Sequence, residues 1–248
     1  MTGVEVVNAR GLSYQALNET VRSLLDNGQR ELVLKGVNGQ RYIGAGVQGQ
    51  GRLEIFGVPG NNLAALMDGL EIEVFGNAQD GVGNTMNDGT VIIHGHATDI
   101  AGYSMRGGRI FIRGNVGCRV GIHMKAFRDK NPLIVIGGKA GDFFGEYMAG
   151  GTLVLLGLDL QPGEAIVGNF VATGMHGGEI FIRGQVDPYW LGKEVKVIKP
   201  TAADQKRLRE IVGDFARYFD LEAEKILARP FIKLIPYNKR PYGTMYAY

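Results

Sequence analysis

Five polar or aromatic side chains stand in the middle of the sequence at positions that other segments fill with small residues. The segment CRVGIHMK holds Arg119, His123 and Lys125, and the segment GEYM, in the next repeat but one, holds Glu146 and Tyr147. These groups could line a protein interface or the mouth of a channel, or they could equally satisfy backbone groups at corners of the chain. The candidate interface or channel residues are these five together with Arg113, His176 and Arg183.

The four histidines of the chain raise the question of a metal site. His94 and His96 are separated by one glycine, but they straddle the predicted end of a strand, and no acid stands nearby at ligand spacing. His123 and His176 lie far along the sequence from this pair. We therefore predict no metal-binding residue, and no catalytic or cofactor-binding residue is assigned in this chain.

The segment GAGVQG, residues 44–49, matches G-x-G-x-x-G, the fingerprint of a dinucleotide-binding turn. Such a turn leads from a strand into a helix, whose N-terminus binds the phosphate. Here the segment QGRLEIFG follows instead, and its alternating pattern predicts a strand that ends at Gly57. We interpret these glycines as the first corner of a repeating structure.

Glycine recurs through the chain at a regular spacing. The sequence has 39 glycines and 8 prolines, and 45% of its residues are hydrophobic, which argues against disorder. Seven glycines each close a short apolar run, and the first four of them are 19 residues apart. These structural corner glycines are Gly57, Gly76, Gly95, Gly114, Gly137, Gly157 and Gly184.

A repeat of this length predicts a parallel β-helix. A helical crossover between parallel strands takes about 30 residues or more, so the repeat is too short to hold one. The positions two and four residues before each closing glycine are aliphatic in all seven copies, which indicates the inward face of a strand. Glycines at the corners would supply positive φ and allow the coils to approach closely.

An outward column stands three residues before each closing glycine. It begins with the charged residues Glu54 and Glu73 and then becomes apolar. We expect a terminal segment or a partner protein to cover this face from the third copy onward. Arg113 and Arg183 follow the apolar column, where they could pair with acids of a neighbouring chain. The apolar members are Ile92, Phe111, Ile134, Val154 and Phe181.

Two further slots recur in the repeat. A stripe of methionines could bind a soft metal, but an internal stack of flexible side chains that fills the core is the favoured interpretation. This slot holds Met67, Met86, Met105, Met124, Met148 and Met175. A corner slot, where side chains can cap backbone N–H groups, holds Asp80, Asp99, Cys118 and Asp142. No general base stands beside Cys118 by local spacing, so we interpret it as a corner residue.

Both ends of the chain depart from the repeat. Residues 13–28 predict a helix with Ser13 as N-cap and Gly28 as C-cap, and ELVLKGV then predicts a strand. Thr201 and Asp204 begin a second helix, whose apolar face could cover the outward column. We expect residues 228–248, which combine tyrosines, prolines and cations, to be extended and to dock on a partner surface.

Charge and composition exclude several classes of protein. A net charge of +2 gives no general electrostatic basis for binding nucleic acid or an anionic membrane. With one cysteine, the chain forms no internal disulfide, and a cysteine-ligated zinc or iron–sulfur site would need ligands from partners. The start lacks the apolar core of a signal peptide, and no segment approaches the roughly 18 apolar residues of a spanning helix. We expect a cytoplasmic protein.

The stretch from about Ile43 to Gly184 resembles the GXGXG domain of glutamate synthase, named for the pattern G-x-x-G-x-x-x-G. The resemblance extends over most of the chain and is closest to the stand-alone form, in which glutamate synthase is divided among separate polypeptides. The same fold occurs in the C subunit of formylmethanofuran dehydrogenase and in a subunit of N-methylglutamate synthase. The segments that carry it are GNAQDGVGNTMNDGTVIIHG, GYSMRGGRIFIRGNVG, RVGIHMK, VIGGKAGDFFGEYMAGG and TGMHGGEIFIRG.

The resemblance implies a right-handed β-helix with a structural role. In large glutamate synthases this domain packs between a glutamine amidotransferase domain and an FMN-binding synthase barrel that carries an iron–sulfur cluster. Ammonia from glutamine travels to the barrel, where 2-oxoglutarate is converted to glutamate, and no catalytic residue is generally assigned to the β-helix. The residues agree with this role, because Met1 precedes Thr2 rather than the cysteine that an N-terminal-nucleophile amidotransferase needs. A synthase barrel alone takes about 250 residues.

The sequence therefore predicts a mainly β chain in three parts. Residues 1–42 form an N-terminal β-α-β cap, residues 43–186 a right-handed parallel β-helix of about seven coils, and residues 187–248 a C-terminal helix with a partner-binding tail. We expect a non-catalytic subunit of a glutamate synthase, whose amidotransferase and FMN/iron–sulfur partners hold the cofactors. The alternative is a scaffold in N-methylglutamate synthase or a formylmethanofuran dehydrogenase-like redox complex. A self-sufficient β-helix enzyme would need clustered acids or a Ca²⁺ site, and the acids here are scattered.

Overall fold

The computed structural model describes residues 3–238, and its strands form one continuous sheet. The first elements are β1 (Glu5–Asn8), α1 (Tyr14–Asp26) and β2 (Glu31–Asn38). Seven strands follow: β3 (Arg52–Val58), β4 (Asp68–Phe75), β5 (Asp88–Ile93), β6 (Arg109–Ile112), β7 (Leu133–Ile136), β8 (Ala149–Leu155) and β9 (Gly177–Arg183). The last elements are the short helix η1 (Pro188–Trp190), β10 (Val195–Ile198), α2 (Ala202–Tyr218), α3 (Ala223–Leu227) and β11 (Phe231–Pro236).

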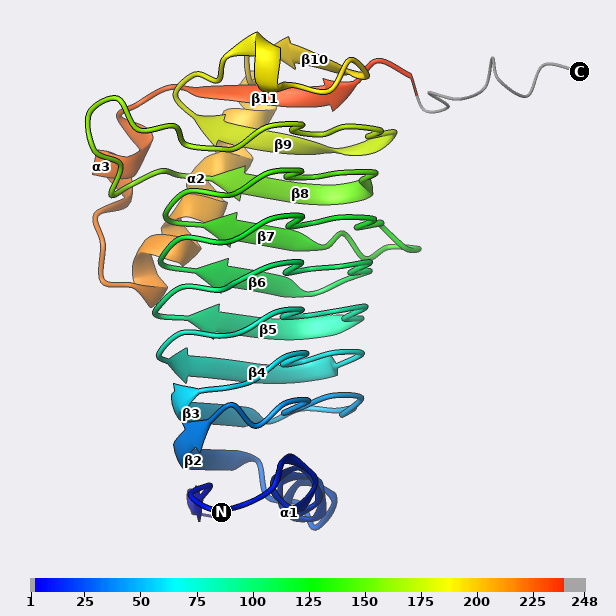
Figure 1. The fold of residues 1–248 in the computed structure, drawn as a ribbon, viewed down its shortest axis with the longest axis vertical. Coiled ribbons are helices and arrows are strands. Elements are labelled where there is room, and N and C mark those ends of the chain that lie inside the picture. Colours follow the sequence, from blue (N-terminus) through cyan, green and yellow to red (C-terminus); the bar gives the residue numbers. More distant parts are fainter. Residues whose placement is uncertain (1–2, 239–248) are drawn as a thin grey trace, which may run out of the picture.

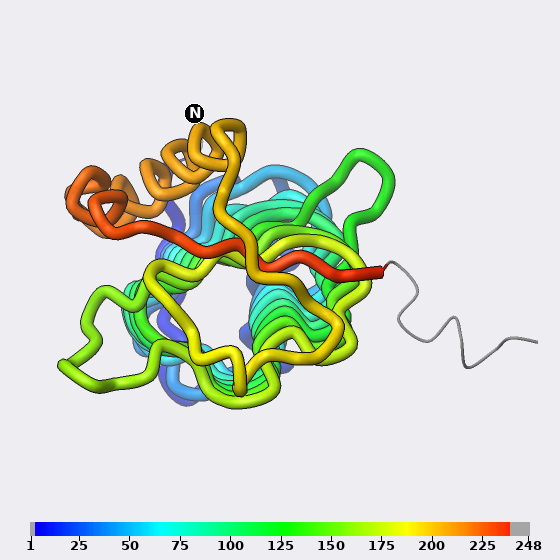
Figure 2. Tube along the Cα trace, turned by 90° about the horizontal axis from the view of Figure 1, so that it is seen from above, coloured from blue at the N-terminus to red at the C-terminus, as the bar shows by residue number. Residues whose placement is uncertain are grey.

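The chain rises coil by coil from the N-terminal cap to the C-terminal cap (Figure 1). Strands β1 to β9 pair in parallel and in order, and β11 then pairs antiparallel with both β9 and β10. Seen from above, the coils superimpose into a ring, with α2 and α3 on one side of it (Figure 2). The predicted mainly β fold, a parallel β-helix with an N-terminal β-α-β cap and a C-terminal helix, is confirmed. The seven strands β3–β9 enclose six turns, close to the predicted seven coils.

The corner glycines act in two ways. Gly57 has a φ of +133°, which L side chains rarely adopt. Gly76 has no such φ, but a Cβ there would lie 2.3 Å from the carbonyl oxygen of Gly57 in the coil below. Close approach of the backbones therefore explains the glycine at this position. The next coils are joined at the same corner by backbone hydrogen bonds, from the N–H of Gly95 to the carbonyl oxygen of Gly76 (3.0 Å) and from the N–H of Gly114 to that of Gly95 (2.9 Å).

The register at β7 differs from the one predicted. Aligning the repeat on Gly137 places Ile134 outward, but the strand pairing and packing place Ile134 in the inner core. Val135 faces outward in its place. The closing glycine of this coil is Gly138, whose N–H donates to the carbonyl oxygen of Gly114 over 2.9 Å. The sequence has two adjacent glycines here and apolar residues on both faces, so the repeat alone cannot distinguish the two alignments.

The interior of the coils is filled by aliphatic side chains and by the methionine slot. All six methionines of that slot are fully buried and belong to the main core cluster, which confirms the interpretation as an internal stack. The corner slot also behaves as expected, since the backbone N–H of Cys118 donates to Asp99 Oδ1 over 2.8 Å. Asp142 caps the next coil in the same way, accepting from the N–H of Asn169 over 2.7 Å.

The N-terminal cap closes the lower end of the stack. The side chain of Ser13 accepts a hydrogen bond from the N–H of Ala16 over 3.2 Å, so the predicted N-cap is confirmed. Leu17, Val21 and Leu25 form the buried face of α1 and join the main core. Within residues 3–238, no helix combines the length and the apolar character that crossing a membrane requires.

Helix α2 supplies the predicted cover of the outward apolar column. Thr201 and Asp204 form the expected capping box at its start. Its buried side chains, which include Val212 and Phe215, pack on the outer side chains of β5 to β9 in a second core cluster. The outer members of that cluster on the strands are Ile92, Phe111, Leu133, Val135, Val154 and Phe181.

The C-terminal segment corrects one expectation. Residues 228–248 were expected to dock on a partner rather than on this chain, yet Phe231–Pro236 forms β11 and pairs with β9 and β10. The reason is that β9 would otherwise leave an unpaired edge at the top of the coil stack, and β11 covers that edge. The part of the predicted docking tail beyond residue 238 lies outside the described residues.

A charge network fastens α2 and β11 to the sheet. Lys233 Nζ lies 2.7 Å from Asp204 Oδ1 and 2.8 Å from Glu179 Oε2, and Arg207 Nη2 lies 2.6 Å from Glu179 Oε1. Burial alone would raise the pKa of Asp204, but hydrogen bonds from Lys233 and Thr201 outweigh it and lower the pKa to about 2. Asp204 is therefore ionised in the folded protein and stabilises the attachment of the C-terminal elements.

Candidate functional site

The turns of successive coils place several predicted residues in neighbouring ladders. Arg119 and Phe143 occupy one ladder, and His123 and Tyr147 occupy the next, all with φ between +50° and +61°. The N–H of Arg119 donates to the carbonyl oxygen of Asp142 (2.8 Å). GEYM therefore lies in the coil directly after CRVGIHMK, not in the next but one as predicted, because an insertion lengthens this single turn.

Side chains on these turns form what we call the corner cluster: Tyr103, Arg119, His123, Phe143, Glu146, Tyr147 and Phe170. The ring of His123 stacks on Tyr147 at 5.5 Å between centroids with an interplanar angle of 10°. Tyr103 meets His123 edge-on at 6.0 Å. Phe143 stacks on Phe170 at 5.0 Å. The cluster thus contains two rows of aromatic rings across four coils, one from Tyr103 to Tyr147 and the other formed by Phe143 and Phe170.

Arg119 joins the aromatic rings to a buried carboxylate. Its Nε lies 3.1 Å from Glu146 Oε2, and its guanidinium carbon lies 4.5 Å from the centre of the Phe143 ring. Glu146 is 8% exposed, so Arg119 compensates a charge that is largely removed from water. Stacking and pairing together hold the Arg119 side chain in place before any partner arrives, which reduces the entropy that binding would cost.

The corner cluster has the composition of a protein-binding surface. Phe170 is 55% exposed and Tyr103 37% exposed, although both carry large apolar rings. Aromatic residues and arginine are enriched in protein interfaces and account for most of their strongly contributing positions. Phe143, Phe170 and Tyr103 were not among the predicted candidates. Phe143 and Phe170 could have been found by their place in the repeat slot of Arg119, whereas Tyr103 stands one residue before the slot of His123 and Tyr147.

Two other predicted residues lie beside the cluster without contacting it. Lys125 is exposed in the irregular segment that follows the His123 turn. His176 is half-buried, and its Nδ1 lies 3.1 Å from the carbonyl oxygen of Gly174. Both follow a methionine of the buried stack, so they occupy one slot of the repeat two coils apart. They extend the polar edge of the corner without sharing its aromatic contacts.

Arg113 and Arg183 lie elsewhere and are engaged by their own chain. The sequence suggested that they could pair with acids of a neighbouring chain. In the structure, Arg113 Nη1 lies 2.7 Å from Asp159 Oδ2, in the insertion after β8. Arg183 donates to the carbonyl oxygens of Ile226 (2.7 Å) and Leu156 (3.3 Å). Both arginines therefore anchor loops against the sheet, on the side that carries α2 and α3.

The structure separates the two histidines that could suggest a metal site. His94 Nε2 lies 2.8 Å from Glu73 Oε1, whereas His96 Nδ1 accepts a hydrogen bond from the N–H of Asn115 over 2.8 Å. His96 thereby caps the backbone of the next coil. In the part of the chain that the structure describes, no three His, Cys, Asp or Glu side chains are grouped so that they could share a metal ion.

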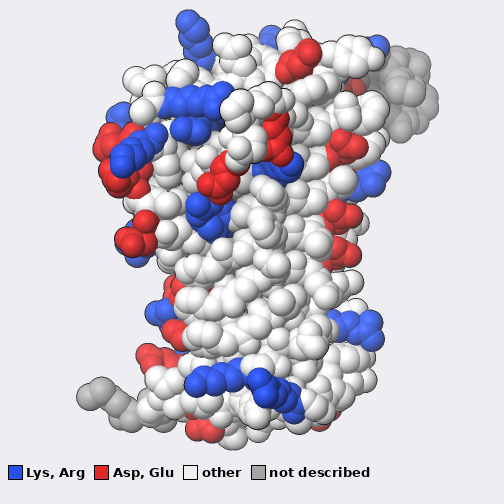
Figure 3. Space-filling view, turned by 60° about the vertical axis from the view of Figure 1, so that its left-hand side comes forward, with Lys and Arg blue, Asp and Glu red and all other residues white. Residues whose placement is uncertain are grey.

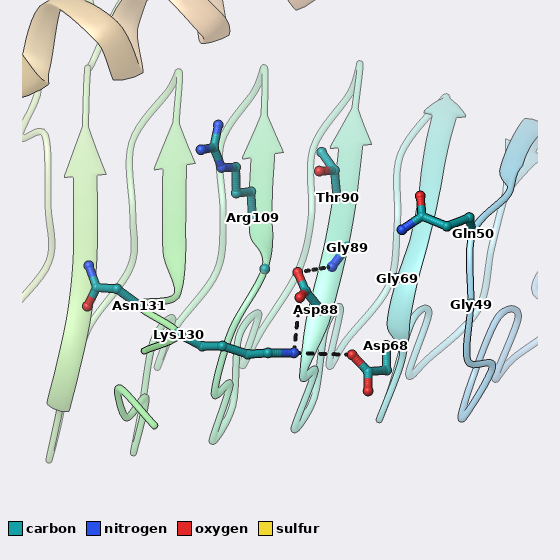
Figure 4. Close-up of a pocket in the computed structure, with 11 residues that line it drawn as sticks. Gly49, Gln50, Asp68, Gly69, Asp88, Gly89, Thr90, Arg109, Lys130 and Asn131 are labelled. Carbon is teal, nitrogen blue, oxygen red and sulfur yellow. Dashed lines mark hydrogen bonds and ion pairs between the residues drawn. The ribbon is translucent and has the colours of Figure 1, made fainter. Parts of the chain in front are cut away.

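A polar cavity of about 500 Å³ at the start of β4, β5 and β6 was missed by the sequence analysis (Figure 4). Lys130, from the insertion between β6 and β7, lies 3.0 Å from Asp88 Oδ2 and 3.3 Å from Asp68 Oδ1. The hydrogen bond to Asp88 raises the pKa of Lys130 above its ordinary value. Lys130 thus pairs with two carboxylates from earlier coils, and we interpret these ion pairs as an attachment that holds the insertion against those coils. The insertion itself was visible in the sequence, but its partners were not.

Comparisons with known proteins agree with this architecture. The profile of the family described as GXGXG motif matches residues 18–237. An uncharacterized protein of Methanocaldococcus jannaschii, MJ1350, is 43% identical over 256 residues, covering 99% of this chain and 98% of that protein. Among solved structures, a chain of the formyltransferase/hydrolase complex (FhcABCD) from Methylorubrum extorquens, in complex with methylofuran, superimposes with a TM-score of 0.60 at 21% identity, covering 92% of this chain and 90% of that one.

The structural likeness supports the fold alone, because the identity is low. The family match covers most of the chain and agrees with the resemblance found in its glycine-rich segments. The protein belongs to the GXGXG motif family.

Proposed function

We propose that this chain is a non-catalytic structural subunit of a multi-subunit glutamate synthase. It would hold a glutamine amidotransferase subunit and an FMN/iron–sulfur synthase subunit together for the conversion of glutamine and 2-oxoglutarate to two glutamates. The observation that carries the proposal is the corner cluster, an exposed aromatic and cationic surface on a rigid stack of coils in a chain of the GXGXG motif family.

The build of the β-helix supports a holding role. Aliphatic side chains and the methionine stack fill the inside of the coils, so contacts with other subunits would be made from the outer surface. Every coil is bonded to the next through its strand and its corners, which fixes the spacing of surface residues across the stack. A surface of this kind can keep two partners at a constant distance and orientation.

The cofactors of such an enzyme would belong to its partners. An iron–sulfur cluster usually takes four cysteines, whereas these 248 residues contain one. That one, Cys118, is half-buried in a corner, where its backbone N–H is bonded to Asp99. FMN would likewise be held in the synthase subunit, where hydride and electron transfer take place.

The experiment must also distinguish a second kind of complex. The superposition on a chain of the FhcABCD complex keeps open a scaffold in a formylmethanofuran dehydrogenase-like assembly, and N-methylglutamate synthase is a further possibility within the glutamate synthase branch. We favour the glutamate synthase assignment because the glycine-rich segments resemble its stand-alone domain. A self-sufficient β-helix enzyme is the remote alternative.

The decisive experiment is affinity purification from the native cell, with identification of the co-purifying chains. Recovery of an amidotransferase and an FMN protein supports the proposal. Recovery of a molybdopterin or tungstopterin subunit contradicts it and favours the formylmethanofuran-type assembly. The matched control is the same purification with Tyr147→Ala and Arg119→Ala combined, which should fold normally and recover less partner.

A further inference from the structure

A groove of about 860 Å³ lies between α2, α3 and β11, at the end of the stack where the chain caps its last coil. Its floor is apolar and includes Leu208, Leu227 and Phe231. Its rim carries Lys199, Arg209 and other exposed side chains, so the groove is open to solvent along its length. Figure 3 brings this side of the molecule forward and shows Lys and Arg side chains near this end, with Asp and Glu side chains among them.

The cations of this rim are not compensated by the chain. The side chains of Lys199, Arg209 and Arg229 form no ion pair or hydrogen bond with any residue in the range 3–238. Glu224 is the one carboxylate that lines the groove, against these three cations. The contrast is with Lys233, on the same strand β11, whose ammonium lies within hydrogen-bond distance of two carboxylates. The groove therefore has an excess of positive charge that an anionic ligand could balance.

The guanidinium of Arg229 lies close to the backbone of Gly184. A Cβ on Gly184 would lie 2.8 Å from Arg229 Nη2. The neighbouring Arg183 is close enough to feel this charge: burial lowers the pKa of Arg183, and the charge of Arg229 lowers it further. The two guanidiniums therefore repel each other, and a carboxylate bound to Arg229 would relieve the repulsion.

We propose that this groove binds an acidic segment of a partner protein. Its carboxylates would pair with Lys199, Arg209 and Arg229, and its apolar side chains would contact the floor. Clusters of arginine commonly recognise acidic motifs, because the planar guanidinium fits a carboxylate with two hydrogen bonds. An open groove suits an extended peptide better than a small molecule, which usually needs enclosure.

This inference rests on the proposed function, because the acidic segment would come from a partner subunit of the complex. No residue of the groove belongs to the turns that carry the corner cluster. A scaffold that holds two subunits needs two contact surfaces, and the groove is the second one. The test below does not depend on which complex the chain belongs to. The groove proposal and the glutamate synthase proposal can therefore fail independently.

The test measures binding of a fluorescein-labelled peptide of repeated Glu-Glu-Leu units to the full chain at low salt. The expected result is that Lys199→Glu, Arg209→Glu and Arg229→Glu together weaken binding about tenfold or more. The matched control reverses three cations outside the groove, Lys35→Glu, Arg128→Glu and Lys193→Glu, so both variants carry the same net charge. Circular dichroism checks that both variants are folded.

Binding to the control variant within about threefold of the unaltered chain supports the groove. Equal weakening in both variants, equal binding of a Gln-Gln-Leu peptide, or no binding at all overturns it. A photo-crosslinker placed at Gln205, in the native cell, then identifies the occupant. Crosslinks to an acidic segment of a partner support the proposal, whereas crosslinks to a neutral or basic segment, or to nucleic acid, contradict it.

Discussion

The outer face under α2 and the corner cluster are both rich in aromatic rings, yet the chain buries one and leaves the other exposed. Phe111, Phe181 and Phe215 are 0% exposed, whereas Phe170 is 55% exposed. In the first region the helix supplies the cover, and in the second no segment within residues 3–238 does so. Apolar side chains of this repeat therefore stabilise the fold where the chain covers them, and they remain available to a partner where it does not.

The covered face should depend most strongly on Phe215. Phe215→Ala removes a fully buried ring that packs against β7, and it should lower the free energy of unfolding by about 3–5 kcal/mol. Urea unfolding followed by circular dichroism measures the change. Phe170→Ala in the corner cluster is the control, with an expected loss below about 1 kcal/mol. Equal losses at the two positions would remove the distinction between the two regions.

The corner cluster should show the opposite behaviour. Arg119→Ala combined with Tyr147→Ala removes the stacked arginine and one of the central rings, so affinity for a co-purifying partner should fall about 30-fold or more, near 2 kcal/mol. The free energy of unfolding should fall by about 1 kcal/mol or less for Tyr147→Ala, and by about 1–3 kcal/mol for Arg119→Ala, which leaves the buried Glu146 without its partner. Calorimetric titration with the purified partner measures the first quantity and urea unfolding the second. Unchanged affinity in the folded variant would show that the partner binds elsewhere.

The attachment of α2 should depend on pH through Asp204. Its folded pKa of about 2 lies below the ordinary value of 3.8, so the unfolded chain takes up a proton first as the pH falls. The stabilisation, roughly 2 kcal/mol, is therefore fully present above about pH 5 and is lost between about pH 4 and pH 2. Asp204→Asn should lower stability at neutral pH by about this amount and flatten the pH dependence in that range. If the free energy of unfolding of Asp204→Asn falls between pH 4 and pH 2 as steeply as that of the unaltered chain, Asp204 is not the source of this pH dependence.

The smallest effect is expected on the part of the outer face that α2 does not reach. Phe56 is 41% exposed and stacks on Phe75 at 4.7 Å, with His94 as the next ring in the row. Phe56→Ala should cost about 1 kcal/mol, the contribution of one exposed stacked pair. A loss as large as that of Phe215→Ala, measured by the same urea unfolding, would mean that cover by the helix is not what distinguishes the two parts of this face.

The sequence predicted the fold well because the repeat records both faces of each strand. The outward column changes from Glu73 to Ile92 where the cover of α2 begins. The sequence therefore indicated that this face is covered, although it left open whether α2 or a partner protein is the cover. The register at Gly137 and Gly138 was not visible, because two adjacent glycines and apolar residues on both faces fit either alignment. When similar residues fit both strand registers, only the hydrogen bonds between neighbouring coils show which register is formed.

The candidate site was predicted in part. Arg119, His123, Glu146 and Tyr147 meet as a cluster because their repeat slots stack, which spacing can indicate. The contacts of Arg113 with Asp159 and of Lys130 with Asp68 could not be predicted, since each joins a loop of irregular length to a distant coil. Pairing across such loops depends on their path in space, and the repeat contains no information about it.

In the proposed function, this chain couples the two active sites of a larger enzyme without carrying either. The most direct measurement is glutamine-dependent formation of glutamate from 2-oxoglutarate by the purified partner subunits, with and without this chain. We predict that each half-reaction proceeds without it, and that glutamine-dependent synthesis needs it and is lost with Arg119→Ala and Tyr147→Ala combined. Full glutamine-dependent synthesis in its absence would contradict the account.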